Sequence, residues 1–285
     1  MKEKNILLER FHKDAKVIFL AEDLLLLNLK ENPDESELEE IIHDLRVNFR
    51  KLISLLYFYK PLIRKKKRVT LERNLKALLR NFGSLRVQHV FLKSAEDFSL
   101  QLGENETVIF NEMIEREIEK RREIEEKKER IDPIEFRVMY EENLKKILGY
   151  GDQIFKDSVY SGNSDSDAFI SKRYHELMNL VASREEDLDY DSSKDVHKLR
   201  VLAKNINYTL KSKEDVLGDI AMKKAEYLKR IQDIAGKIHD ADVHMKIVSS
   251  FERREEEVEM RTRFMENIRN ERNENIEKLR NLIRK

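Results

Sequence analysis

The sequence predicts an all-α protein built as two pseudo-symmetric four-helix bundles, with about ten helices in total. Glycine and proline are scarce, with 7 and 3 occurrences in 285 residues. This scarcity favours long helices over sheets, which need many turns. Apolar residues recur at helical spacing along most of the chain. An internal repeat then predicts two similar halves, an N-terminal bundle at residues 1–149 and a C-terminal bundle at residues 150–285.

The repeat is carried by two pairs of matching segments. Residues 43–50 read His-Asp-Leu-Arg-Val-Asn-Phe-Arg, and residues 197–204 read His-Lys-Leu-Arg-Val-Leu-Ala-Lys, 154 positions later (197 − 43). A second pair, residues 83–90 and 236–243, begins with Gly in both copies and is separated by 153 positions (236 − 83). Two matches at almost the same offset favour duplication of one ancestral unit over chance.

The first half is expected to contain six helices. Pro33 ends the first helix, because proline disfavours helical geometry in the preceding residue. Ser36 and Glu39 have the spacing of a capping box and begin the second. Gly83 is a good C-terminal residue for the third, and Pro133 lies in the first turn of the sixth. The expected ranges are 7–29, 36–60, 69–82, 85–100, 106–129 and 132–149.

The second half is expected to contain five helices after a connecting loop. Residues 158–167 include the run Ser-Gly-Asn-Ser-Asp-Ser, which is typical of a loop and is expected to connect the halves. The duplicated segment that begins at His197 lies on the second of these helices. The expected ranges of the other four helices are 167–184, 217–239, 241–254 and 258–284.

Composition excludes several classes of protein. Cysteine is absent, which excludes disulfides, thiolate metal sites and a cysteine nucleophile. No apolar run approaches the ~18 residues of a membrane span, and the charged N-terminus leads into no secretory segment. We therefore expect a soluble cytoplasmic protein without a membrane partner.

The charges are unevenly distributed although the net charge is zero. Charged residues make up 39% of the chain, and the segment from Lys60 to Arg86 carries ten cations against the single acid Glu72. Within this segment the run Arg64–Arg68 has two interpretations, a solvated turn or a patch that attracts polyanions. The spacing leaves both open.

The duplicated segment predicts an anion-binding face. Each copy places a histidine and two cations at positions i, i+3 and i+7, which lie on one face of a helix. A repeated cationic face predicts a ligand with repeated anionic groups. The alternative is that each histidine is a hydrogen-bonded packing residue beside the apolar face of its helix.

These segments resemble the CHAD (conserved histidine α-helical domain) proteins. The family pattern His-x-x-Arg-Val-x-x-Arg appears at residues 43–50 and again, with Lys at its last position, at residues 197–204. A second family signature ends in Gly-x-x-His-Asp-x-Asp-Val, and residues 236–243 read Gly-Lys-Ile-His-Asp-Ala-Asp-Val. The resemblance covers roughly residues 7–255, and a two-fold internal repeat is part of it.

The resemblance implies non-catalytic binding of inorganic polyphosphate in a basic channel lined by both repeats. It implies no catalytic residue, metal site or cofactor. Together with the cytoplasmic location expected from the composition, binding of polyphosphate makes association with polyphosphate granules one of the roles that stay open. Because a protonated histidine donates two hydrogen bonds, binding is expected to strengthen toward acidic pH. The residues expected to bind polyphosphate are His43, Arg46, Arg50, Lys51, Arg80, Arg86, His197, Arg200, Lys204, Lys229, Arg230 and His239.

The sequence departs from the family pattern at several positions. The first copy of the second signature lacks both acids, so their structural role is in doubt there. In the second histidine helix, Asn205 and Asn207 stand where the family often has Arg. We therefore expect the second copy to bind more weakly.

Two other functions remain open from the sequence. The pairs His43-Asp44 and His239-Asp240 are typical of metal-dependent phosphohydrolases, which use them to hold a divalent ion. A nucleic-acid binder is the other alternative, because any basic surface attracts phosphates. The chain has no Trp and no basic motif interleaved with aromatics, so nucleic acid is expected to bind only weakly and without sequence preference.

Overall fold

The computed structural model describes residues 6–28, 35–81, 83–126, 133–148, 154–156, 158–159, 165–252 and 254–284. Over these ranges the regular structure is helical, and the β contact is one isolated antiparallel bridge between Ile63 and Phe155. The all-α prediction is confirmed. None of the helices in these ranges combines the length and the apolar content that crossing a membrane requires.

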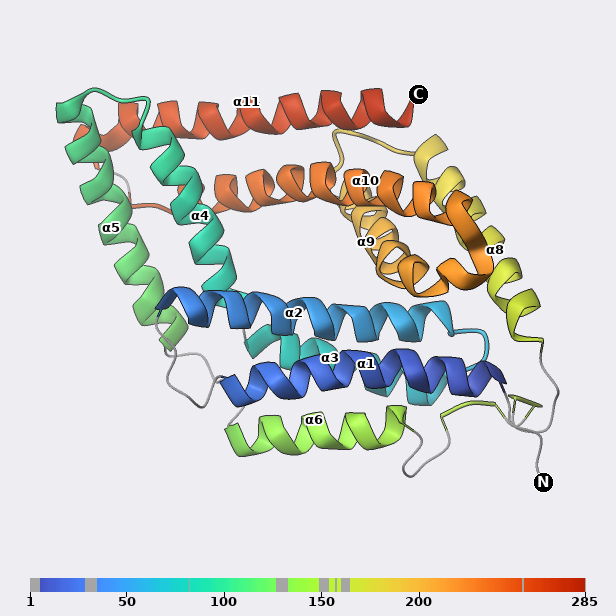
Figure 1. The fold of residues 1–285 in the computed structure, drawn as a ribbon. Coiled ribbons are helices and arrows are strands. Elements are labelled where there is room, and N and C mark those ends of the chain that lie inside the picture. Colours follow the sequence, from blue (N-terminus) through green and yellow to red (C-terminus); the bar gives the residue numbers. More distant parts are fainter. Residues whose placement is uncertain are drawn as a thin grey trace. The chain divides into compact units, whose positions relative to one another are not determined.

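The described residues form ten α-helices (Figure 1). They are α1 (Ile6–Asn28), α2 (Glu35–Phe58), α3 (Lys65–Asn81), α4 (Gly83–Ser99), α5 (Glu104–Glu126), α6 (Pro133–Ile147), α8 (Ser166–Glu186), α9 (Ser193–Leu210), α10 (Glu214–Ser249) and α11 (Val258–Ile283). Two short 3₁₀ helices, η2 (Lys211–Lys213) and η3 (Glu255–Glu257), precede α10 and α11. Residues 160–164 of the loop expected at 158–167 lie outside the described residues, and Ser166 and Asp167 already belong to α8.

One predicted helix boundary is wrong. The sequence analysis expected a break between residues 239 and 241, but α10 continues from Glu214 to Ser249. Neither Gly nor Pro stands at the expected break, so nothing in the local chain opposes helical geometry there. The backbone departs from helical geometry at Gly218 instead, with φ of 62°, a conformation that only glycine adopts at low cost.

The chain forms two compact units. The first comprises Met1–Phe82, Ile131–Ser183 and Leu202–Lys229, and the second comprises Gly83–Arg130, Arg184–Val201 and Arg230–Lys285. Each unit therefore contains segments from both halves of the sequence. The predicted boundary between the sequence repeats, at residues 149 and 150, lies outside the described residues and stays a prediction.

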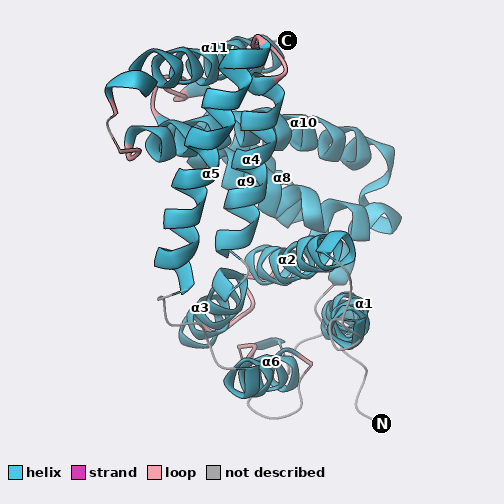
Figure 2. Cartoon of the chain, turned by 90° about the vertical axis from the view of Figure 1, so that its left-hand side faces the viewer, coloured by secondary structure: helices cyan, strands magenta, loops and turns pink. Residues whose placement is uncertain are grey.

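The first unit contains a four-helix bundle of α1, α2, α3 and α6. Each helix packs against two neighbours, and Figure 2 shows the four nearly end-on. Phe19 and Phe49 meet the Tyr140 ring of α6 at centroid distances of 5.9 and 6.3 Å. The chain after α6 also contributes to this unit, because Arg173 of α8 donates from Nε to the Phe58 carbonyl at 3.0 Å.

The second unit contains a four-helix core made by α4, α5, the C-terminal part of α10 and α11. Its buried residues form one cluster with members on all four helices. Phe91 of α4 contacts His244 of α10 at 5.4 Å between ring centroids, and Phe110 of α5 contacts Phe264 of α11 at 5.0 Å.

These two contacts join equivalent positions of the sequence repeat. Phe91 and His244 are 153 positions apart (244 − 91), and Phe110 and Phe264 are 154 apart (264 − 110). A residue meets its own repeat equivalent only near a two-fold axis that relates the two copies. The second unit is therefore a pseudo-symmetric bundle, in which α4 and α5 pair with their duplicates.

Candidate functional site

The two copies of the predicted face have the same burial pattern. On α2 a buried row consists of Ile42, Leu45, Phe49 and Leu52. On α9 the buried row occupies the equivalent positions Val196, Leu199, Ala203 and Ile206. In both copies the histidine is exposed, and the cations at i+3 and i+7 are half-buried. Burial of the apolar row fixes the rotation of each helix, so the cations lie along the edge of a core.

On α2 the cations are held by neighbouring groups of the first unit. Arg46 donates from a terminal nitrogen to the Leu79 carbonyl of α3 at 3.1 Å, which places it beside the exposed Arg80. Lys51 donates to Asn48 Oδ1 at 3.1 Å. Arg46 and Arg80 are thus brought together where α2 meets the end of α3, and Lys51 is held on α2 itself.

A buried carboxyl group of α1 interacts electrostatically with Lys51. Glu22 of α1 is 0% exposed, and neither of its carboxylate oxygens has a hydrogen-bond partner among the described residues. Burial, followed by the charge of Asp23, raises the pKa of Glu22 well above its ordinary value, while the Lys51 ammonium opposes the change. Glu22 is therefore protonated over an unusually wide range of pH.

On α9 and α10 the predicted residues of the second unit form a cluster. The rings of His197 and His239 lie 5.2 Å apart at 31° to each other. His239 Nδ1 is 3.2 Å from Asp240 Oδ1. Burial raises the pKa of Asp240, but the hydrogen bond with His239 and the charge of Arg200 outweigh it and lower the pKa. Asp240 therefore stays ionised and orients His239, a role that the sequence analysis did not assign.

The glycine of the second signature, Gly236, packs against Arg200. A Cβ atom at this position would lie 3.6 Å from Nε of Arg200, so the guanidinium lies directly against the α10 backbone. The Nε atom is buried and has no hydrogen-bond partner among the described residues. Glycine thus makes room for a half-buried arginine whose terminal nitrogens remain for a ligand.

Two further residues of the signature region are structural. Asp242 accepts from Arg272 Nε of α11 at 2.7 Å, and both side chains are 13% exposed. His244 is buried against Phe91, and burial lowers its pKa. These contacts fasten α10 to α11 and α4 rather than face solvent.

Further predicted residues lie on α9, α10 and α4. Lys204 lies one turn after Arg200 on α9 and is half-buried. Lys229 and Arg230 are both exposed on α10, at successive positions that point about 100° apart. Arg86 lies on α4, and its side chain is outside the described part of the structure.

The two asparagines of α9 have packing roles in the first unit. Asn205 Oδ1 accepts a hydrogen bond from the Ser54 hydroxyl at 3.3 Å, and Asn207 is buried. The expectation that this copy binds more weakly stays a prediction.

The phosphohydrolase alternative requires a group of side chains that holds a divalent metal ion. Over the described ranges, no three or more His, Asp or Glu side chains are grouped so that they could hold a metal ion. Although His197 lies beside His239, neither the His43-Asp44 pair nor the His239-Asp240 pair is part of such a group in these ranges.

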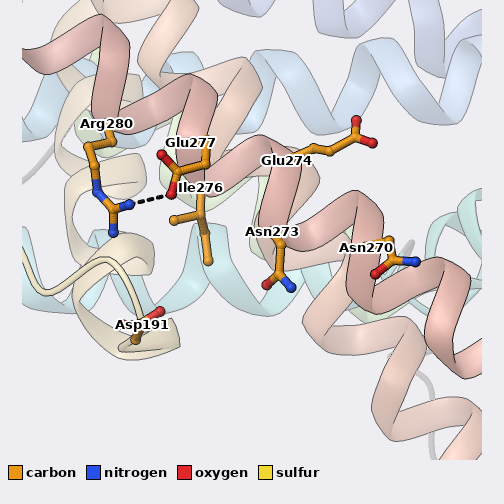
Figure 3. Close-up of a pocket in the computed structure, with 7 residues that line it drawn as sticks. All are labelled: Asp191, Asn270, Asn273, Glu274, Ile276, Glu277 and Arg280. Carbon is orange, nitrogen blue, oxygen red and sulfur yellow. Dashed lines mark hydrogen bonds and ion pairs between the residues drawn. The ribbon is translucent and has the colours of Figure 1, made fainter.

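A surface depression of about 510 Å³ lies elsewhere in the second unit. Figure 3 shows Asp191 opposite a row of α11 side chains that includes Glu274 and Glu277. Its single cation, Arg280, pairs with Glu277. Three carboxylates around one paired arginine do not favour a polyanion, so this depression is not part of the predicted site.

Comparison with known families decides the classification. A profile of the CHAD domain matches residues 24–249, about four-fifths of the chain. The chain belongs to the CHAD family. The CHAD match includes both histidine helices and the second signature, which confirms the resemblance seen in the sequence, and it fits polyphosphate binding at the level of the family.

One solved structure extends the comparison to the whole fold. The chain is similar to PptA from Streptomyces chartreusis, with a TM-score of 0.67 and 10% sequence identity over 98% of this chain and 99% of that one. At this identity the likeness shows a shared fold. No curated protein matches the CHAD chain described here.

Proposed function

We propose that this CHAD protein binds inorganic polyphosphate without catalysing a reaction on it. The observation that supports this most strongly is the repeated cationic face, in which both copies have the same order of exposed histidine and half-buried cations. Two such faces match a ligand whose anionic groups repeat along a strand.

The local contacts suit the faces to bind phosphate groups. Arg46 is fixed by the Leu79 carbonyl and Arg200 lies against Gly236, so both guanidinium groups are partly immobilised before a ligand arrives. A preorganised arginine loses less side-chain entropy on binding and offers paired donors to phosphate oxygens. Lysines contribute point charges that tolerate different positions of the strand.

Replacing Arg46, Arg50, Arg200 and Lys204 together by Ala tests this proposal. We expect the affinity for polyphosphate to fall at least about a hundredfold, because four charge-assisted contacts are lost. Calorimetry with polyphosphate of defined length measures the affinity, and circular dichroism checks that helix content is retained. A control variant removes four exposed cations elsewhere, Arg137, Lys145, Arg269 and Lys278. Equal affinity in the test and control variants would refute the site assignment.

The same experiment separates the alternatives. Excess single-stranded or double-stranded nucleic acid is expected not to displace polyphosphate from the wild-type protein. Incubation with Mg²⁺ or Mn²⁺ is expected to leave the polymer length unchanged on a gel. Displacement would favour a general polyanion binder, and shortening would favour a phosphohydrolase.

We also propose that the protein meets its ligand in the cytoplasm, at polyphosphate granules. Fluorescence microscopy of a tagged chain tests this proposal. Signal on granules is expected for the wild-type protein, and diffuse signal is expected for the fourfold variant.

A further inference from the structure

Helix α3 carries an unusually unbalanced charge. Its 17 residues include one acid, Glu72, and seven cations, which are Lys65, Lys66, Lys67, Arg68, Arg73, Lys76 and Arg80. The equivalent segment of the second repeat, residues 219–235, carries four cations and three acids. The charge excess on α3 therefore belongs to the first copy and is not a property of the repeat.

Four of these cations lie on one face of α3. Lys66, Arg73, Lys76 and Arg80 are separated by seven, three and four positions and are all exposed, so they form a stripe along the helix. The buried residues Leu71, Leu75 and Leu78 lie on the opposite side. We call these four residues the α3 stripe.

The α3 stripe is not used for stability within the described structure. Arg68 pairs with Glu72, but no ion pair with a described residue involves any of the four stripe cations. Other charged helices pair their cations, as Arg137 does with Glu141 and Lys278 with Glu274. Like charges three and four positions apart destabilise a helix. The four cations therefore repel one another, and no acid among the described residues offsets this repulsion. Binding of an anionic ligand explains the stripe better than a role in stability does.

The α3 stripe is continuous with the face on α2. Arg46 of α2 donates to the carbonyl of Leu79, and the next residue along α3 is Arg80. From Arg80 the stripe extends to Lys66, fourteen positions away, which is about 21 Å at 1.5 Å per helical residue. A polyanion with at least one charge per ~3.4 Å carries about six charges over that length.

We propose that the α3 stripe is an accessory binding surface that makes the protein prefer long polyphosphate chains over short ones. This rests on the proposed function, since the stripe continues the same polymer away from the α2 face. A short oligomer occupies the α2 face alone. A long chain also reaches Arg73, Lys76 and Lys66, and each additional contact releases counterions and steepens the dependence of affinity on salt.

The test compares tripolyphosphate with long-chain polyphosphate. In the variant Lys66→Ala/Arg73→Ala/Lys76→Ala we expect the affinity for the long chain to fall about tenfold, as three exposed ion contacts imply. The slope of log affinity against log salt should decrease by about 2. The affinity for tripolyphosphate should stay unchanged. The matched control Arg137→Ala/Lys145→Ala/Lys172→Ala removes the same number of exposed cations from α6 and α8 of the first unit and should keep the long-chain affinity.

Each outcome decides the inference. Loss of long-chain affinity in the stripe variant alone supports it. Equal losses of long-chain affinity in the stripe and control variants overturn it and indicate a general electrostatic effect. Equal affinity per site of the wild-type protein for tripolyphosphate and long-chain polyphosphate overturns it as well. If the wild-type protein binds neither ligand, the proposed function itself fails. Because all three positions are exposed in a helix, alanine is expected to preserve the fold, and thermal melting checks this.

Discussion

At the scale of single residues, Gly236 links the sequence signature to the position of Arg200. Alanine at this position meets Arg200 Nε at ordinary contact distance, 3.6 Å, whereas a larger side chain must occupy the space of the guanidinium. Glycine in a helix interior costs about 1 kcal/mol relative to alanine. The contact with Arg200 therefore restricts this position to glycine or alanine and excludes larger side chains.

We predict opposite effects for two substitutions at Gly236. Gly236→Ala should raise the melting temperature and keep polyphosphate affinity, because helix propensity improves and Arg200 can stay in place. Gly236→Leu should weaken binding about tenfold or more, because it displaces Arg200. Calorimetry and thermal melting on both variants measure these effects. Wild-type affinity in the leucine variant would show that the position of Arg200 does not matter.

Glu22 predicts a dependence of stability on pH. Its pKa is raised in the folded protein by burial, so its stabilising contribution is complete below the unfolded pKa and is lost as pH rises through the folded pKa. Near pH 8 the free energy of unfolding of Glu22→Gln should therefore exceed that of the wild type by about 1–3 kcal/mol. Near pH 5 the difference between the two proteins should be smaller.

The control for this prediction is Glu40→Gln, which changes an exposed acid of α2. It should follow the wild-type curve within error at both pH values. Urea unfolding monitored by circular dichroism gives the free energies. A difference between wild type and Glu22→Gln that is the same at pH 5 and pH 8 would contradict the assignment of the pH effect to Glu22.

At the scale of elements, the two copies fasten their helices differently. In the second copy, Asp242 of α10 holds Arg272 of α11. The equivalent position of the first copy is His89 (242 − 153), so this acid is missing on α4. Helix α5 is instead held by its own cations, since Arg116 pairs with Glu257 at 2.5 Å and Lys120 with Glu252 at 2.5 Å. These pairs join α5 to η3 and to the residue Glu252 after α10, so the first copy has a different pattern of ion pairs from the second.

Removal of the α10 to α11 ion pair should destabilise the second unit. Asp242→Ala leaves Arg272 half-paired in a largely buried position, and we expect a loss of about 2–3 kcal/mol. The control Glu274→Ala breaks an exposed pair with Lys278 and should cost less than about 0.5 kcal/mol. Chemical denaturation measures both. Similar losses for the two variants would mean that burial of the pair is unimportant.

At the scale of the whole molecule, each compact unit is assembled from both halves of the sequence. The core of the second unit combines Phe91 and Phe110 from the first half with His244 and Phe264 from the second. In the first unit, Lys213 of η2 pairs with Asp14 of α1. The first half supplies all four helices of the bundle in the first unit, whereas the core of the second unit needs residues from both halves.

We predict that the second half of the chain folds only together with the first. Fragment 150–285 should lack a cooperative thermal transition, because α10 and α11 expose apolar residues that α4 and α5 of the first half cover. An equimolar mixture with fragment 1–149 should regain helix content and unfold cooperatively. Circular dichroism on the fragment and on the mixture measures this. A cooperative transition in isolated fragment 150–285 would show that the second half is an independent domain.

Much of the fold and part of the candidate site could be predicted from the sequence. The all-α class, most helix ranges and the register of the repeat follow from local periodicity and from the scarcity of glycine and proline. The same periodicity placed His43 and Arg46, and His197 and Arg200, on equivalent faces. The break expected near residue 240 was wrong, because neither Gly nor Pro stands there and the backbone has no local reason to leave the helix.

The sequence by itself determined which residues share a helix face, because helical periodicity depends only on neighbours along the chain. Only the tertiary structure decided which face packs against which. It paired α4 and α5 with α10 and α11, buried Glu22, placed Arg200 against Gly236 and turned the α3 stripe away from its core. Such choices depend on the fit between side chains far apart in the sequence, and periodicity carries no information about that fit.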